Sequence, residues 1–159
     1  MNLYKGKVVL ITGGGRATLS NGRCGSIGYG IATAFAKEGA DIVITGRNVQ
    51  KLEDAVNELQ EKYKVRVLAI QADVNDKNDN DALVKGVIEE VKKAFGRLDV
   101  LINNAQASAS GVPLKDNTTE QFDLALYSGL YATFYYMKHS YELLKESKGS
   151  VINFASGAG

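Results

Sequence analysis

The stretch KVVLITGGG, residues 7–15, decides the fold class of this chain. It begins with a short apolar run rich in β-branched residues, which is typical of a buried strand. Three consecutive glycines follow, and then a segment rich in Gly, Ser and Asn. From Ser26 to Glu38 apolar residues recur at helical spacing, and Gly39 suits the end of a helix. The stretch therefore predicts a buried strand, a glycine-rich turn and an amphipathic helix.

The same alternation of strand and helix continues along the chain, without hairpin signals between the strands. We expect strands at Lys7–Ile11, Ile42–Thr45, Val65–Ile70, Leu98–Ile102 and Ser150–Ala155, and helices at Ser26–Glu38, Val49–Tyr63, Asp79–Phe95 and Thr118–Leu144. Strands separated by helices pair in parallel through right-handed crossovers. The sequence therefore predicts an α/β fold, a doubly wound parallel sheet, in one domain over residues 1–159 with no internal linker.

Composition excludes several classes of protein. The 159 residues are 45% hydrophobic and 23% charged, which excludes an intrinsically disordered chain. A net charge of +1 gives no long-range attraction to nucleic acid or to an acidic membrane. Cys24 is the single cysteine, and His139, the single histidine, has no partner at metal-ligand spacing, so neither disulfides nor a metal site are expected. Without a signal-peptide core or a membrane-spanning run, a cytoplasmic protein is expected.

The glycine-rich turn is the first candidate site. In a doubly wound sheet, ligands bind beyond the carboxyl ends of the strands, and a helix N-terminus offers free N–H groups to a phosphate. Glycines let the backbone approach such a group closely, and Gly25, Gly28 and Gly30 follow Gly13–Gly15 at the start of the helix. An ordinary loop is the alternative, but the position between a buried strand and an amphipathic helix favours nucleotide binding.

These residues resemble the short-chain dehydrogenase/reductase family, whose turn reads T-G-x-x-x-G-x-G and whose first helix ends in A-x-E-G-A. Gly13, Gly14 and Gly15 match the first part of the turn, and Ser26, Ile27 and Gly28 match the second, with Ser26 in place of a family glycine. The S-I-x-x-G-I-A opening of the helix resembles the divergent enoyl-carrier-protein reductases. Residues Arg16 to Cys24 are an insertion, which is either a flap over a cofactor or a surface excursion.

The end of the second strand bears on the choice of nucleotide. An acidic residue there accepts hydrogen bonds from the ribose 2′-hydroxyl of NAD, but here Gly46 takes its place and Arg47 follows. A guanidinium binds phosphate through paired hydrogen bonds, so NADP(H) is the preferred cofactor and NAD(H) the alternative. Arg16 is a candidate to assist at the phosphate.

Two further segments match the pockets that the family builds for the cofactor. By resemblance, Asp73 and Val74 bracket the adenine ring, and Asn104 and Ala105 lie along the cofactor. They close the run DVLINNA, residues 99–105, in which Asn103 is expected to tie strands together. Gln106 replaces a glycine of the family pattern.

The family transfers hydride between a nicotinamide and a carbonyl or alcohol carbon of a small-molecule substrate. By resemblance Ser156 is the catalytic serine. The family's catalytic tyrosine, and the lysine four residues after it, follow that serine by more than the three residues that remain here, whereas Tyr141 and Lys145 form only a surface pair. We therefore expect an N-terminal two-thirds of such an enzyme, with strands six and seven missing and no turnover by this chain alone. The alternative is a non-catalytic dinucleotide-binding or regulatory protein.

The fourth helix departs from the family in one position. Gly129 stands where the family has an asparagine that holds a water, and Ser128 lies beside it. Tyr127, Tyr131 and Tyr135 recur every four residues and form one aromatic face. This face is either core or a subunit interface. Because the family pairs this helix across a dimer axis, the resemblance implies a homodimer or homotetramer.

Overall fold

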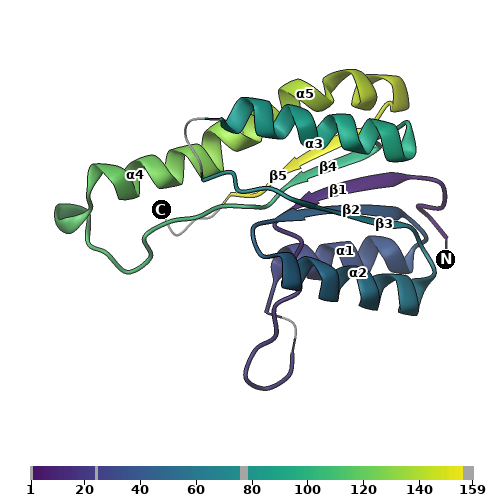
Figure 1. The fold of residues 1–159 in the computed structure, drawn as a ribbon, viewed down its shortest axis with the longest axis horizontal. Coiled ribbons are helices and arrows are strands. Elements are labelled where there is room, and N and C mark those ends of the chain that lie inside the picture. Colours follow the sequence, from purple (N-terminus) through teal and green to yellow (C-terminus); the bar gives the residue numbers. More distant parts are fainter. Residues whose placement is uncertain (1, 24, 76–78, 156–159) are drawn as a thin grey trace.

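The computed structural model describes residues 2–23, 25–75 and 79–155 and contains a five-stranded, wholly parallel sheet. The strand order is β3-β2-β1-β4-β5 (Figure 1). The strands are β1 Val8–Thr12, β2 Asp41–Gly46, β3 Val67–Gln71, β4 Val100–Asn103 and β5 Ser150–Asn153. All five lie within about two residues of their predicted ranges, so the predicted parallel sheet is confirmed.

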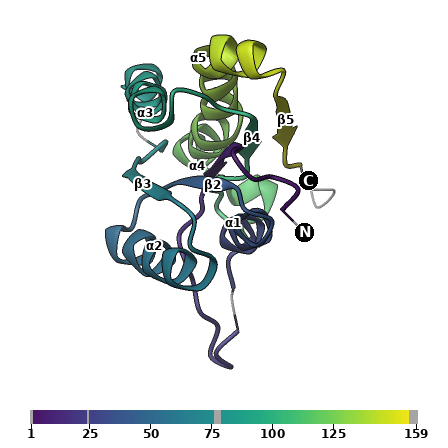
Figure 2. The same cartoon turned by 90° about the vertical axis from the view of Figure 1, so that its right-hand side faces the viewer.

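Helices cover both faces of the sheet, as a doubly wound fold requires (Figure 2). The helices α1 Ile27–Lys37 and α2 Val49–Tyr63 cover one face, and α3 Asn80–Phe95 and α5 Ala132–Ser147 cover the other. Successive residues of β1 serve the two faces in turn, since Val9 and Ile11 pack with α1 and α2 while Val8 and Leu10 pack with α3 and α5. In the described residues, no helix is both long and apolar enough to cross a lipid bilayer.

Strand register brings the functional segments to one edge. Ile11 of β1 pairs with Ile44 of β2 and with Ile102 of β4. The strands run in the same direction, so the residues that follow each of them emerge side by side at the carboxyl edge. The glycine-rich turn, the Arg47 segment and the segment after Asn103 therefore meet there.

The long fourth helix differs from its prediction. Helix α4, Thr119–Ala125, passes into a π-helical turn, Leu126–Tyr131, which continues into α5. The predicted Thr118–Leu144 helix is thus one rod with an irregular centre. Thr118 caps it through a capping box with Gln121. A π-helical turn is rare and is frequent at functional sites, and this one contains the buried Ser128.

Candidate functional site

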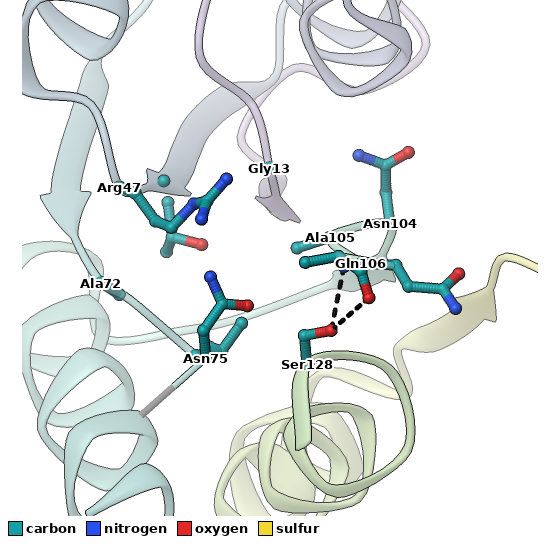
Figure 3. Close-up of a pocket in the computed structure, with 12 residues that line it drawn as sticks. Gly13, Arg47, Ala72, Asn75, Asn104, Ala105, Gln106 and Ser128 are labelled. Atoms are coloured by element: carbon teal, nitrogen blue, oxygen red, sulfur yellow. Dashed lines mark hydrogen bonds between the residues drawn. The ribbon is translucent and has the colours of Figure 1, made fainter. Parts of the chain in front are cut away.

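A cavity of about 230 Å³ lies at the carboxyl edge of the sheet (Figure 3). We call it the main cavity. Segments that follow β1, β2, β3 and β4 line it, and the π-helical turn closes one side. Its lining residues are Gly13, Thr45, Gly46, Arg47, Ala72, Val74, Asn75, Asn104, Ala105, Gln106, Ala107 and Ser128.

Thr12 joins the ends of β1 and β4 beneath this cavity. Its Oγ1 accepts hydrogen bonds from the backbone N–H groups of Asn104 (3.0 Å) and Ala105 (2.9 Å). The Asn104 side chain donates through Nδ2 to the Thr12 carbonyl oxygen (2.9 Å). The Asn104 carboxamide is therefore tied to the end of β1.

The glycine turn is packed too closely for any larger residue. Gly13 has φ +71°, a conformation that L residues with a side chain rarely adopt. A Cβ on Gly28 would overlap the Gly13 carbonyl oxygen, and one on Gly14 would overlap the Ile44 side chain. Ser26 caps α1, its side chain accepting from the Tyr29 N–H (3.3 Å). The N-terminus of α1 thus lies directly against the turn.

A second cavity, of about 320 Å³, adjoins the main cavity, and we call it the turn cavity. The two share Gly13, Gly46 and Arg47 as lining residues. The complete lining of the turn cavity is Gly13, Gly15, Ala17, Gly25, Ser26, Gly46, Arg47, Asn48 and Lys51. The Arg47 guanidinium points into the space between the glycine turn and Asn75 (Figure 3). The sequence reading missed Lys51, whose only signal is its place one turn after the Asn48 cap of α2.

Arg16 lies apart from both cavities. Its Nε forms an ion pair with Glu58 Oε2 (2.5 Å), and its Nη1 donates to Thr18 Oγ1 (2.9 Å). Tyr29 belongs to the same cluster through a hydrogen bond with Glu58. Burial, together with this hydrogen bond, raises the pKa of the Tyr29 phenol to about 12. The structure therefore places the Arg16 guanidinium on Glu58, away from the residues around Arg47.

The described part of the inserted segment is a surface excursion rather than a flap. The Gly25 N–H donates to the Ala17 carbonyl (2.9 Å) and the Leu19 N–H to the Arg23 carbonyl (2.8 Å), so the two arms pair. Beyond this base the excursion runs away from the sheet, past α1 and α2 (Figure 1). Only its base, at Ala17 and Gly25, lines the turn cavity. Cys24 is outside the described residues.

The segment after β3 contributes differently from the two residues that the resemblance singled out. Val74 lines the main cavity, whereas Asp73 is exposed and its carboxylate accepts from the Asn75 N–H (3.1 Å). Buried Asn80, which the sequence reading missed, donates to the carbonyls of Val74 (3.0 Å) and Tyr127 (3.1 Å). This amide holds the cavity wall against the start of the π-helical turn.

Ser128 fixes the segment after β4 from the other side. Its Oγ accepts a hydrogen bond from the Ala107 N–H (2.9 Å; Figure 3). The same hydroxyl lies 3.1 Å from the Ala107 carbonyl oxygen and 2.7 Å from the Leu124 carbonyl oxygen, and it can donate to either. The next residue, Gly129, lies next to the Gln106 side chain: a Cβ on Gly129 would make ordinary van der Waals contact with Gln106 Nε2, at 3.4 Å. The Gln106 carboxamide thus lies over a glycine, across the cavity from Arg47 (Figure 3).

The end of β5 reaches the same edge. Asn103 donates through Nδ2 to Asn153 Oδ1 (2.8 Å), and the Phe154 N–H donates to the Asn103 carbonyl (3.0 Å). The prediction that Asn103 ties strands together is confirmed. Ser156, the predicted catalytic serine, lies outside the described residues.

Comparison with known proteins shows which family this chain is similar to. A family profile described as enoyl-(acyl carrier protein) reductase matches residues 22–159. A 12alpha-hydroxysteroid dehydrogenase from a Clostridium species is 57% identical over the whole of this chain and 59% of its own length.

Two solved structures have the same fold. L-sorbose reductase from Gluconobacter frateurii, complexed with NADPH and L-sorbose, is 31% identical with a TM-score of 0.84, covering 99% of this chain and 55% of its own. An NAD+-bound xylitol dehydrogenase is 28% identical with a TM-score of 0.84 and the same coverage. The chain therefore spans somewhat more than half the length of these relatives.

Proposed function

Because the chain belongs to the short-chain dehydrogenase/reductase family, we propose that it binds NADP(H) in an oxidoreductase that acts on a carbonyl or alcohol substrate. The observation that carries the cofactor proposal is Arg47, whose guanidinium points into the cavity at the end of β2. No acidic residue lines either cavity among the described residues. An acid at the end of β2 would repel a 2′-phosphate, whereas a guanidinium binds one.

The glycine cradle fits a dinucleotide. A Cβ on Gly28 would overlap the Gly13 carbonyl oxygen, so only glycine lets the start of α1 pack directly on the turn, where a helix N-terminus can accept a pyrophosphate. In this proposal the pyrophosphate lies at the turn and the start of α1, the adenine near the segment after β3, and the rest of the cofactor along the segment after β4. The residues assigned are Gly13, Gly14, Gly15, Ser26, Ile27, Gly28, Arg47, Asp73, Val74, Asn104 and Ala105. Arg16 is assigned a supporting role, through the excursion that it anchors.

When bound, the nicotinamide supplies or accepts the hydride. The chain's own residues bind and orient it: Thr12 and Ser128 hold the segment from Asn104 to Ala107 in place from its two ends. Ser156 is proposed to steady the substrate oxygen.

Titration of the natural protein with NADPH and NADH, followed by nucleotide fluorescence, tests the cofactor proposal. We expect tighter binding of NADPH, and R47Q to weaken NADPH binding by roughly ten- to a hundredfold while NADH binding stays within about twofold. R23Q, on the exposed excursion, is the matched control. Equal affinity of the wild type for the two nucleotides, or tighter NADH, refutes the role given to Arg47.

For the substrate we propose the hydroxyl or keto group of a steroid. The 57% identity to a 12alpha-hydroxysteroid dehydrogenase supports this choice. So does an apolar groove that begins at Ser108, next to the main cavity, and includes the highly exposed Leu114 and Phe122, at 92% and 61% exposure. A rate assay comparing a 12α-hydroxysteroid with L-sorbose and xylitol tests it. A preference for either sugar substrate contradicts the steroid proposal, and NADPH binding without any turnover supports the non-catalytic alternative.

We further propose that the fourth helix forms a subunit interface. Leu130, Tyr131, Phe134 and Tyr141 are large apolar side chains exposed along its length. Light scattering on the natural protein gives the test, with a dimer or tetramer as the expected mass. A monomer at micromolar concentration contradicts this proposal.

A further inference from the structure

The turn cavity has a charge distribution of its own. Among the described residues that line it, Arg47 and Lys51 are charged, both positively. Neither side chain forms an ion pair or a hydrogen bond within the described ranges, so both charges are available to a ligand. A cavity lined by two unpaired cations and by glycine backbone favours an anion.

The backbone of Lys51 is fixed against the glycine turn in three ways. Its N–H donates to the Asn48 side chain (2.9 Å), and its carbonyl accepts from the Arg16 N–H (2.8 Å). A Cβ on Gly15 would lie 3.2 Å from the Lys51 Cβ, so the turn packs directly on the stem of this side chain. Lys51 therefore starts at the wall of the cavity, and its ammonium is the part left free to move.

The ion pair between Arg16 and Glu58 decides which cations near the turn remain unpaired. Glu58 follows Lys51 by two helical turns on α2, yet it pairs with Arg16 across the base of the excursion. Arg16 is thereby neutralised, and its guanidinium is committed to holding the excursion. The remaining positive charges at the turn are those of Arg47 and Lys51.

We propose that Lys51 is a second specificity-determining residue, which binds the 2′-phosphate of NADP(H) together with Arg47. The inference rests on the proposed cofactor. Its physical basis is that the N-termini of α1 and α2, capped by Ser26 and Asn48, both border the turn cavity, so helix dipoles add to the two formal charges. Two cations balance the charge of the dianionic 2′-phosphate, whereas the neutral 2′-hydroxyl of NADH has no charge that a second cation could bind.

The test compares K51M with K62M in the natural full-length protein. Lys62 is on the same helix, in its last turn, where its ammonium lies 5.5 Å from the Tyr63 ring. We expect K51M to weaken NADPH and 2′,5′-ADP binding about tenfold, the effect of one charge-assisted hydrogen bond, with NADH and 5′-AMP unchanged within about twofold. K62M is expected to change none of these affinities, and K51R to restore NADPH binding.

Two outcomes overturn the inference. One is NADPH affinity in K51M equal to that of the wild type, and the other is an equal loss for NADPH and NADH, which places Lys51 on a part common to both nucleotides. Thermal unfolding checks that each variant is folded, and K51Q serves if K51M is not. A wild-type protein that binds neither nucleotide refutes the proposed function itself. A wild-type protein that prefers NADPH, together with a K51M variant of equal NADPH affinity, refutes the inference alone.

Discussion

Removal of the Ser128 hydroxyl is expected to destabilise the protein, because this hydroxyl holds Ala107, which lies 21 residues earlier in the sequence. Ser128 is 1% exposed, and its Oγ is the acceptor for the Ala107 N–H and a donor to a carbonyl of Ala107 or Leu124. In S128A one acceptor and one donor are lost at roughly 1 kcal/mol each, so the free energy of unfolding falls by about 2 kcal/mol. That loss lowers Tm by roughly 4–8 °C in a chain of this size.

Ser140 provides the matched control. It is also fully buried, but it lies on α5, after the π-helical turn that contains Ser128, and its Oγ donates to the carbonyl of Tyr136, four residues earlier in the same helix. That carbonyl already accepts the regular helical bond, so S140A is expected to cost less than about 1 kcal/mol. Urea unfolding of the two variants and the wild type measures the difference. If S128A and S140A are equally stable, Ser128 does not fix the Ala107 segment and the reasoning is wrong.

Two further predictions concern the turn and the sheet. G28A is expected to weaken NADPH binding more than tenfold, because the new Cβ overlaps the Gly13 carbonyl oxygen. G86A, in open space on α3, is expected to leave NADPH binding unchanged and to raise the free energy of unfolding by up to about 1 kcal/mol. Nucleotide titration measures the binding of both variants, and urea unfolding measures their stability. Burial opposes ionisation of Asp99, but hydrogen bonds, above all from Arg97, hold its pKa below the usual 3.8. Its carboxylate therefore stabilises the fold above its unfolded pKa, and this contribution is lost as pH falls through the folded pKa. D99N is expected to cost about 2 kcal/mol at pH 7 and to flatten the acid side of the stability curve; an unaltered acid limb contradicts this assignment.

Regular elements were predictable because their causes are local. Helix α2 has the predicted bounds, Val49–Tyr63, since its apolar face, its Asn48 cap and its end are all written within one segment. The spacing of Tyr127, Tyr131 and Tyr135 correctly predicted one aromatic face, with ring centroids 5.2 and 6.3 Å apart along it. The residue that enters the core, however, is the adjacent Tyr136, at 1% exposure.

The parts that were missed depend on contacts between distant segments. The π-helical turn contains Ser128, whose Oγ accepts from the Ala107 N–H, and helical periodicity in the sequence does not reveal this contact. The ion pair of Arg16 with Glu58 spans 42 residues, so the sequence shows a basic residue near the glycine-rich turn but not its partner. Asn80 was missed for the same reason, because its significance comes from the Tyr127 carbonyl.

The strand order has a consequence for synthesis on the ribosome. Strand β1 is made first but lies in the middle of the sheet, where Val9 pairs with Ile42 on one side and with Val100 on the other. While the N-terminal part is emerging, β1 and β2 can pair and α1 and α2 can cover one face, but the face that later packs against α3 and α5 stays open. The nascent chain thus exposes the apolar surface that later packs against α3 and α5, and exposed apolar surface of this kind promotes aggregation. The carboxyl edge of the sheet that lines the main cavity is complete only after Ala107 and Ser128 have left the exit tunnel.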